Sequence, residues 1–400
     1  MNILIFEWKN FGIEDVCEAL TNLGHTYKCV SNELMRERVN AEFDELFDKE
    51  FSSAHFDCVF TFNYSPIISN NCNKRNVPYI AFIYDSPLVS LYSYTIINPC
   101  NYVFIFDSSL YLDFKKENIN TVYYAPLAAN VARLEKQIAN ASSNSSPNTA
   151  LATQLDESFY DCDVSFVGSM YNEKHNLFDR FKNLPEFTKG YLDAIMNAQL
   201  KVYGYYFIED ALSSGIIEEL QKSVPVSPNK DGVETVSYIY AYYFIARKLA
   251  AMERRDLLGA VSKHFNTNLY TPNPTPELPD IHNMGPIDYY NDMPQIFAKS
   301  RINLNISLRS IRSGIPLRGI DIMGAGGFLM SNYQADFYEF FTPGEDLVLF
   351  ESKDDLISKC DYYLKHDAER RQIAANGHGI IKDKHTYEVR LKEMFEVVFN

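Results

Sequence analysis

The chain lacks any surplus of positive charge. Its 400 residues include 37 Lys and Arg against 52 Asp and Glu, which gives a formal net charge of −15 at pH 7. Binding along nucleic acid or an anionic membrane surface requires an excess of basic side chains. The composition therefore argues against a nucleic-acid partner, although local basic sites remain compatible with it.

Metal-type cysteine spacing and long apolar runs are missing as well. No CxxC pair occurs among the seven cysteines, so we expect reduced, mostly buried thiols, as in a cytoplasmic protein. The longest apolar run beyond the N-terminus, 238–246, is far shorter than the roughly 20 residues of a membrane-spanning helix. Glu7 and Lys9 interrupt the N-terminal run where a signal peptide would be apolar. We expect a cytoplasmic protein without a transmembrane segment.

Apolar side chains are plentiful: they make up 46% of the sequence, and 400 residues are enough for two ordinary domains. In the first half, runs rich in Val, Ile, Phe and Tyr are nearly continuous rather than alternating. They predict strands buried on both faces of a parallel sheet, with helices over 13–23 and 65–75 between them. The predicted strands are 2–7, 56–63, 77–85, 102–107 and 121–128.

A single low-complexity segment, "NASSNSSPNTALATQ" at 140–154, separates the two halves. Its Ser, Asn, Thr and Ala residues cannot bury enough apolar surface to order themselves. We expect a linker over about 140–155, which would end an N-terminal domain of residues 1–155.

The second half predicts another doubly wound α/β domain, 156–384, with a helical insertion over about 174–265. A charged helix in the tail is expected to end at Gly377, because glycine often terminates helices. A last helix, 385–400, can cross back to the N-terminal domain. Two such domains would hold ligands in the cleft between them, at the carboxyl ends of their strands. The predicted strands are 163–169, 267–272, 302–307, 327–332 and 346–351.

The segment 312–334, "RSGIPLRGIDIMGAGGFLMSNYQ", has the features of a helix start at this sheet edge. Pro316 suits the first turn of a helix, and the Gly-Gly pair would end it. Backbone N–H groups and the positive end of the helix dipole, preceded by Ser313 and Gly314, form a potential anion site.

Charged side chains surround the same helix start. Arg318 lies in the first turn, with Arg309 and Arg312 in the preceding loop. Asp321, three residues after Arg318, falls on the same helical face. A cation for a diphosphate and a carboxylate for ribose hydroxyls, one turn apart, would suit a nucleotide-sugar. The alternative is a solvated Arg318–Asp321 ion pair, worth about 0.3 kcal/mol.

A second candidate phosphate site lies in "SFVGSMYNEKH", 165–175. The predicted strand ends in Gly168 and Ser169, and a short loop leads to Lys174. Backbone N–H groups and a lysine at such a turn can bind phosphate. The alternative is an ordinary turn between a strand and a helix.

Several longer segments resemble one family. "SGIPLRGIDIMGAGGFLMSNYQ", "FTPGEDLVLFESKDDLISKCDYYL" and "ERRQIAANGHGIIKDKHTYEVRL" are similar to the C-terminal half of glycosyltransferases resembling the spore-maturation protein CgeB. "FNYSPIISNNCNKRNVPYIAFIYDSPLVSLYS", "NPCNYVFIFD" and "VYYAPLAAN" resemble the N-terminal half. The resemblance covers most of the chain outside the linker and the insertion. It implies the α/β GT-B fold of two Rossmann-like domains facing a cleft, the N-terminal one for the acceptor and the C-terminal one for a nucleotide-sugar.

The resemblance also implies roles for individual residues. Many retaining GT-B enzymes carry two glutamates separated by seven residues; Asp321 matches the second, expected on the ribose, whereas Ser313 replaces the first. Ile287 and Tyr289 are implied as contacts of the base. The expected donor-binding residues are Gly168, Ser169, Lys174, Ile287, Tyr289, Arg309, Arg312, Ser313, Gly314, Arg318, Asp321, Gly326 and Gly327.

Two residues are candidates for the catalytic base that an inverting reaction needs. Asp85 directly follows a predicted strand, although Asp-Ser-Pro is equally good turn chemistry. His282 is the second candidate, with a loop histidine as the alternative. The "DCD" at 161–163 imitates a metal-binding DxD but precedes a strand, so we expect no metal.

These features together predict a hexosyltransferase that moves a sugar from a nucleotide-sugar, most simply a UDP-sugar, to a glycan or protein acceptor. No cofactor is expected, since the nucleotide-sugar is a substrate and Arg318, Lys174 and the 168–169 loop would stabilise the leaving diphosphate. Two alternatives stay open. One is a nucleotide-sugar epimerase of the same fold. The other is an inactive nucleotide- or sugar-binding module, an alternative supported by the presence of Ser313 in place of the first acid.

Overall fold

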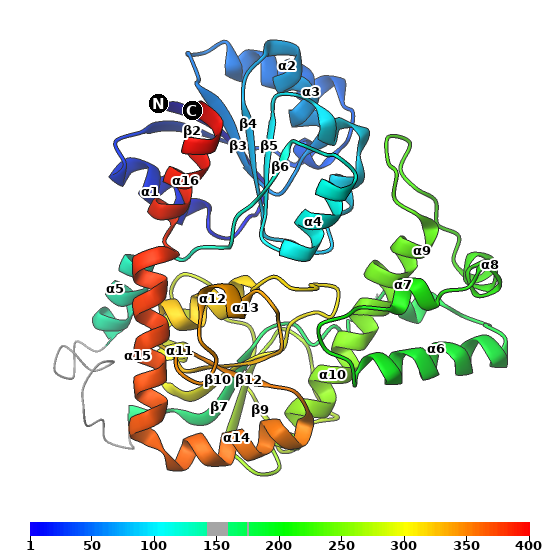
Figure 1. Ribbon diagram of the computed structural model, residues 1–400, viewed down its shortest axis with the longest axis vertical. Helices are drawn as coiled ribbons and strands as arrows, with labels where there is room; N and C mark the ends of the chain where they lie inside the picture. The colour runs from blue at the N-terminus through cyan, green and yellow to red at the C-terminus, as the bar shows by residue number, and fades with distance from the viewer. Residues whose placement is uncertain (142–158, 174–175) are drawn as a thin grey trace. The chain divides into compact units, whose positions relative to one another are not determined.

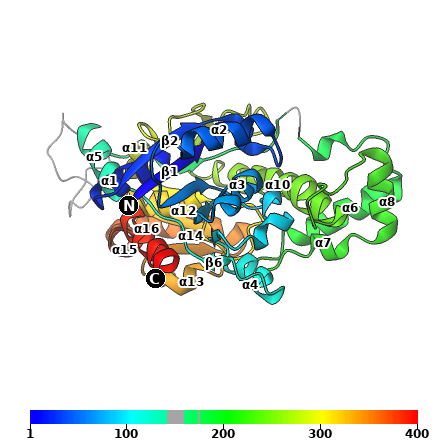
Figure 2. The same cartoon turned by 90° about the horizontal axis from the view of Figure 1, so that it is seen from above.

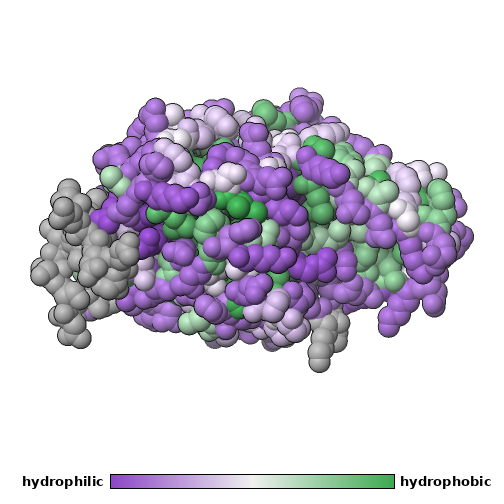
Figure 3. Space-filling model, turned by 90° about the horizontal axis from the view of Figure 1, so that it is seen from below, coloured by the Kyte–Doolittle hydropathy of each residue, from purple (hydrophilic) through white to green (hydrophobic). Residues whose placement is uncertain are grey.

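The structure, a computed structural model, describes residues 1–141, 159–173 and 176–400 and divides into two compact units (Figure 1). Unit 1 comprises Met1–Ala129, Pro228–Glu234 and His385–Asn400. Unit 2 comprises Asn130–Ser227 and Thr235–Lys384. Within the described ranges, no helix combines the length and apolar composition that a membrane crossing requires. Hydrophilic side chains predominate on the face drawn in Figure 3, with smaller apolar areas among them.

Unit 1 is built on a six-stranded parallel sheet in the order β2-β1-β3-β4-β5-β6. Its central strands are buried along their whole length, as their Val-, Ile- and Phe-rich sequences predict. The edge strand β2 is largely exposed, and its mixed sequence TYKCVS gave no apolar run to detect. The strands are β1 (Asn2–Glu7), β2 (Thr26–Ser31), β3 (Cys58–Phe62), β4 (Tyr79–Ile83), β5 (Asn101–Ile105) and β6 (Val122–Tyr124).

The helices of unit 1 include the last one of the chain, α16, which packs beside α1 (Figures 1 and 2). Gly12, at φ +85°, allows this approach, because a Cβ there would lie 2.7 Å from Tyr387 Oη. Asn22 donates to Glu388 over 3.1 Å across the same contact. The α-helices are α1 (Ile13–Asn22), α2 (Ala41–Phe51), α3 (Pro66–Arg75), α4 (Ser108–Lys116) and α16 (Tyr387–Phe399), with short 3₁₀ helices at Glu33–Arg36, Val89–Tyr92 and Tyr94–Ile97.

The short segment Pro228–Glu234 belongs to unit 1 although its neighbours in sequence belong to unit 2. Asp231 accepts two hydrogen bonds from Arg38 Nη1, both 2.9 Å, and one from Ser93 Oγ at 2.6 Å. Its carbonyl accepts from the Tyr94 N–H at 2.8 Å. Charged and backbone hydrogen bonds therefore fix the segment to unit 1.

Unit 2 contains a second six-stranded parallel sheet, in the order β12-β11-β10-β7-β8-β9. The chain order reverses between β7 and β10, which is where ligands bind in open α/β sheets. The strands are β7 (Cys162–Val167), β8 (Thr267–Tyr270), β9 (His282–Asn283), β10 (Ser300–Asn305), β11 (Leu329–Asn332) and β12 (Val348–Phe350).

The insertion in unit 2 has an apolar core of its own, which includes Leu192, Ile208, Leu220 and Phe244. Its helices α6, α7 and α8 lie apart from the sheet of unit 2 in both views (Figures 1 and 2). The helices of unit 2 are α5 (Val131–Ala141), α6 (Glu186–Gln199), α7 (Ile208–Ala211), α8 (Ser214–Ser223), α9 (Val236–Ile239), α10 (Ala246–Val261), α11 (Met293–Ala298), α12 (Leu317–Gly324), α13 (Phe337–Phe340), α14 (Lys353–Lys365) and α15 (Asp367–Lys384), with a 3₁₀ helix at Phe178–Arg180 and a π-helix at Tyr240–Ile245.

Two sequence-based boundaries differ from the structure. The first stretch of unit 1 ends at Ala129, before α5, because α5 packs on α11 within unit 2. Most of the predicted linker, about 140–155, lies outside the described residues. The helix expected to end at Gly377 instead continues to Lys384, and this prediction was wrong.

Candidate functional site

The predicted helix start at the carboxyl edge of the unit 2 sheet is present as α12. Pro316 is its N-cap, in an extended conformation, and the helix begins at Leu317. Gly326, at φ +73°, adopts the left-handed conformation that ends a helix. A Cβ on Gly327 would lie 2.8 Å from Asn303 Nδ2, so this glycine allows α12 to return closely to β10. The local fold therefore explains the presence of glycine at both positions without any ligand.

Arg318 and Asp321 lie one turn apart on α12, with Arg318 Nη1 at 3.9 Å from Asp321 Oδ2. The two side chains differ in exposure, 28% for Arg318 and 2% for Asp321, so this is no solvated surface pair. Tyr289 donates its hydroxyl to Asp321 Oδ1 over 3.1 Å. The structure thus brings together three of the residues predicted to bind the donor. Arg318 also stacks over Phe297, 5.7 Å from the ring centre, and contacts Met293 Sδ.

The loop after β7 is held by side chains that follow β8. Asn273 Oδ1 accepts from the Met170 N–H at 2.8 Å and from Ser169 Oγ at 3.1 Å. The Tyr171 N–H donates to Ser169 Oγ at 3.0 Å, with Tyr171 itself at φ +53°. Two N–H groups of this loop therefore already have partners within the protein. Lys174, the cation predicted beside them, lies outside the described residues.

Arg254, which sequence reasoning missed, connects this loop to the end of β10. From α10, it donates to the carbonyl of Ser169 and, over 2.6 Å, to that of Ile306. It is only 8% exposed, and its Nε has no hydrogen-bond partner among the described residues. Its guanidinium also lies over the rings of Phe166 and Tyr171, at 5.1 and 4.8 Å.

Arg254 and Arg318 are electrostatically coupled. Burial lowers the pKa of Arg254; the nearby Tyr171 and Glu253 oppose that shift, and the positive charge of Arg318 adds to it. A bound anion would relieve the repulsion between two such positive charges. The carboxyl edge of the unit 2 sheet is therefore suited to an anionic group.

Arg309, in contrast, is used by the fold itself. Its guanidinium forms a bidentate pair with Glu253, with distances of 2.8 and 2.9 Å, and it donates to the carbonyls of Val202 and Leu200. Both charged side chains are nearly inaccessible, and Arg309 stacks on Tyr203 at 3.6 Å from the ring centre. The predicted phosphate contact is thus engaged in anchoring the segment that follows α6.

The other residues predicted to bind the donor lie around α12 and β8. Ser313 and Gly314 are buried, and the Ser313 carbonyl accepts from the Asp336 N–H at 3.0 Å. Arg312 and Ile287 are half-buried.

The two candidate bases lie on different units. His282 is exposed on the two-residue edge strand β9 of unit 2. Asp85 is exposed after β4 of unit 1. Its carboxylate accepts from Asn63 Nδ2 at 2.8 Å, while Asn63 Oδ1 accepts from the Asp85 N–H at 3.2 Å. Asn63 follows β3, so the pair links the carboxyl ends of two adjacent strands within unit 1.

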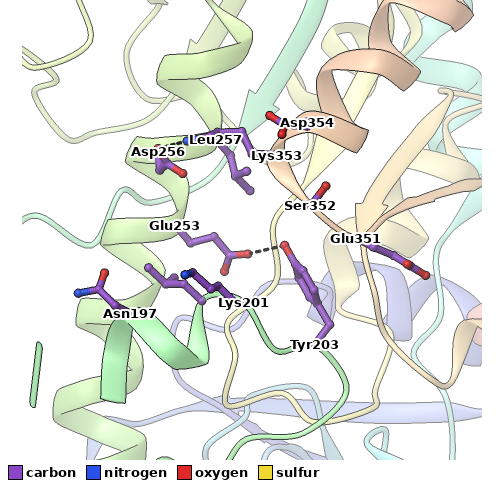
Figure 4. Close-up of a pocket in the computed structure, with 11 residues that line it drawn as sticks. Asn197, Lys201, Tyr203, Glu253, Asp256, Leu257, Glu351, Ser352, Lys353 and Asp354 are labelled. Atoms are coloured by element: carbon purple, nitrogen blue, oxygen red, sulfur yellow. Dashed lines mark hydrogen bonds and ion pairs between the residues drawn. The ribbon is translucent and has the colours of Figure 1, made fainter. Parts of the chain in front are cut away.

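A separate cavity of about 430 Å³ in unit 2 lies beside α6, α10 and the start of α14 (Figure 4). Tyr203 Oη donates to Glu253 at its centre over 3.2 Å, and Lys353 pairs with Asp256 at 3.0 Å. Four acidic residues line it against two lysines, an unfavourable balance for a diphosphate. The lining residues are Asn197, Leu200, Lys201, Tyr203, Glu253, Asp256, Leu257, Glu351, Ser352, Lys353 and Asp354.

Metal ligands do not gather in the part of the chain that the structure describes: no three His, Cys, Asp or Glu side chains form a metal-binding group there. Whether the chain works without a metal stays a prediction.

Comparisons with known proteins connect this geometry to a fold. Residues 247–396 match a family described as glycosyl transferase-like. No curated protein sequence matches the chain at a significant level. The matched range contains Arg254, Arg318 and Asp321.

Several solved structures are similar over the whole chain. Sucrose-phosphate synthase from Thermosynechococcus elongatus superposes with a TM-score of 0.55 at 11% identity, covering 100% of this chain and 99% of that one. Anabaena HepE in complex with UDP-glucose gives a TM-score of 0.55 at 9% identity, with the same two coverages. WaaG, a glycosyltransferase of lipopolysaccharide biosynthesis, gives 0.50 at 10% identity, covering 100% of both chains. The predicted two-domain α/β fold of GT-B glycosyltransferases is confirmed.

Proposed function

We propose that this protein is a glycosyltransferase of the CgeB-like type, which transfers a hexose from a nucleotide-sugar, with a UDP-sugar as the first candidate, to a glycan or protein acceptor. The observation that carries the proposal is the group of Arg318, Asp321 and Tyr289 around the start of α12, at the carboxyl edge of the unit 2 sheet. The match of residues 247–396 to a glycosyl transferase-like family supports it. The UDP-glucose complex of the structurally similar HepE supports a UDP-sugar donor.

The chemistry requires stabilisation of the leaving nucleoside diphosphate as its negative charge develops. Arg318 is the accessible cation for this role, 28% exposed at the first turn of α12. Arg254 is buried, so it acts by holding the Ser169 and Ile306 carbonyls and by its charge. Such a site needs no resident metal, and we propose that the reaction is metal-independent.

Asp321 and Tyr289 supply the polar partners for the nucleoside part of the donor. Their 3.1 Å hydrogen bond holds the carboxylate in place beside Arg318. A carboxylate can accept bonds from two neighbouring ribose hydroxyls. In an inverting reaction the exposed carboxylate of Asp85 would be the base, oriented by Asn63.

The proposal predicts that uridine diphosphate raises the melting temperature of the protein, because a ligand that binds the folded state stabilises it. We expect Arg318→Ala and Asp321→Asn each to weaken binding about tenfold or more, as expected when a charged hydrogen bond of about 1.5–3 kcal/mol is lost. Arg247→Ala, at an exposed arginine of α10, is the matched control and should bind normally. Unchanged affinity in both site variants would contradict the assignment.

Arg254→Lys tests the buried cation of the pair. A lysine keeps the charge but concentrates its donors on one nitrogen, so it cannot bridge the Ser169 and Ile306 carbonyls as a guanidinium does. We expect weaker nucleotide binding than in Arg255→Lys, a change at the adjacent exposed arginine.

Turnover separates the proposal from its alternatives. Transfer of sugar to an acceptor supports the glycosyltransferase. Isomerised sugar formed from the donor alone would indicate an epimerase, and binding without transfer or donor hydrolysis would indicate an inactive module.

A further inference from the structure

Two cysteine side chains meet on the surface of unit 1. Cys17 on α1 and Cys29 on β2 have their Sγ atoms 3.5 Å apart. Cys29 is exposed and Cys17 half-buried, whereas Cys58, Cys72, Cys100, Cys162 and Cys360 are all buried. The scattered spacing of the cysteines gave no sign of this pair, because the edge strand β2 was not detected in the sequence.

The pair lines a surface hollow of about 470 Å³. Three of the other lining residues are acidic, namely Glu7, Glu14 and Glu18, and none is basic. The negative potential of such a hollow attracts cationic reagents and repels anionic ones. A small molecule therefore has access to both thiols, and its charge should affect how fast it arrives.

We propose that Cys17 and Cys29 form a covalent modification site, at which the two thiols become an intramolecular disulfide by exchange with a small cationic disulfide. The site is separate from the nucleotide site of unit 2, and the proposal does not depend on the function proposed above. The other five cysteines cannot compete, since their burial excludes the reagent.

The exchange balances without any further reactant. One thiolate of the pair attacks a sulfur of the reagent, a mixed disulfide forms, and the other half of the reagent leaves as a thiol. The second thiolate of the pair then attacks the mixed disulfide and releases the second half as a thiol. The two protons lost by the cysteines end on the two released thiols. The protein is oxidised by two electrons and the reagent is reduced by two.

The local structure makes Cys17 the first attacking thiol, because the hydrogen bond to Cys17 and burial raise the pKa of Cys29, and the short distance between the two sulfurs favours the second step. The hydrogen bond from Cys29 lowers the pKa of Cys17, against burial and the charges of Glu14 and Glu7, which raise it. Closing the 3.5 Å separation to the roughly 2.0 Å of a disulfide requires a small movement of two side chains. β2 is an edge strand bonded only to β1 in the sheet, so it can yield to this movement.

The test uses the full-length reduced protein and three probes of different charge: cystamine (cationic), 2-hydroxyethyl disulfide (neutral) and glutathione disulfide (anionic). Peptide mapping without reduction should detect a crosslink between the peptides of Cys17 and Cys29, with the five buried cysteines still free. At low salt we expect cystamine to react about tenfold faster than glutathione disulfide, and the difference should shrink at high salt as the charges of Glu7, Glu14 and Glu18 are screened.

Single variants provide the internal control. Cys17→Ser should leave Cys29 as a stable mixed disulfide with the probe, and Cys29→Ser should do the same for Cys17. The wild-type result needs no variant, so a variant that fails to fold does not affect the conclusion. Mixed disulfides on both cysteines of the wild type, without a crosslink, would overturn the proposal. Faster reaction with glutathione disulfide than with cystamine would overturn its charge preference.

Discussion

At the scale of single residues, two buried arginines of unit 2 show how the partner decides the role. Arg309 is neutralised by a bidentate bond to Glu253, so its charge is satisfied within the fold. Arg254 instead donates to two uncharged carbonyls, and Glu253, already paired with Arg309, acts on it only through its nearby charge. The positive charge of Arg254 therefore still contributes at the sheet edge. The sequence placed Arg309 in a basic cluster with Arg312 and Arg318, but its partner Glu253 lies 56 residues away along the chain.

The buried Arg309–Glu253 pair predicts a stability effect without a binding effect. Arg309→Met leaves the Glu253 carboxylate buried without its cation, which should lower the free energy of unfolding by about 3 kcal/mol. Adding Glu253→Gln should recover part of this loss, since the uncompensated charge is removed. Urea unfolding followed by circular dichroism measures the free energy of unfolding of the single and the double variant. The nucleotide affinity of the folded Arg309→Met protein should be unchanged. A large loss of affinity would instead indicate that Arg309 contacts the donor.

At the scale of helices and strands, α15 shows where local signals fail. Gly377 was expected to end a helix, yet α15 runs through both Gly377 and Gly379. The reason is a close contact: a Cβ on Gly377 would lie 2.4 Å from the Asp346 carbonyl oxygen. Glycine is needed here so that the helix can approach the neighbouring backbone, and not for a turn.

The two glycines of α15 form a matched pair for a test. Gly377→Ala should destabilise unit 2, because the new methyl group would push α15 away from Asp346. Gly379→Ala, with nothing within 4 Å of the new Cβ, should stabilise it by roughly 0.5–1 kcal/mol through helix propensity alone. Thermal unfolding of the two variants compares them directly. Equal changes in melting temperature would mean that the backbone at Asp346 moves to accommodate the methyl group at little cost.

The strands were more predictable than the site. The buried strands β1, β3 and β4 follow from nearly continuous apolar sequence, whereas β2 and β9 offer no such run. The roles of Asn273 and Arg254 depend on partners 104 and 85 residues away, so no local pattern reveals them. Family resemblance implied Tyr289 beside the base and Asp321 on the ribose, but their hydrogen bond to each other was not predicted. Helix spacing alone gave only the Arg318–Asp321 pair.

At the scale of the whole molecule, Asp231 fixes the segment Pro228–Glu234 to unit 1. Burial raises the pKa of Asp231, but hydrogen bonds from Ser93 and Arg38 outweigh it, so the net pKa is lowered. A carboxyl group whose pKa is lowered by folding stabilises the folded state above its unfolded pKa of about 4. That contribution is lost as the pH falls through the folded-state pKa.

Asp231→Asn should therefore destabilise unit 1 at pH 7 by about 1 kcal/mol, a small value because the pair is partly exposed. The difference from wild type should disappear as the pH falls through the lowered folded-state pKa of Asp231, because the wild-type carboxylate is then protonated as well. Trp8, the single tryptophan of the chain, packs against the core of unit 1, so its fluorescence reports unfolding of that unit. Asp113→Asn, in an exposed pair with Lys116, is the control and should show little change at any pH. A difference that persisted at low pH would contradict the ionic explanation.

Unit 1 is assembled from segments that lie far apart in the sequence, and this affects how it can fold during translation. The ribosome translates Met1–Ala129 before α16, which packs on α1. Domains generally fold as units while the chain is being translated. Until α16 is translated, the surface of α1 that it covers stays exposed, so unit 1 is completed only after the chain of unit 2 has been made.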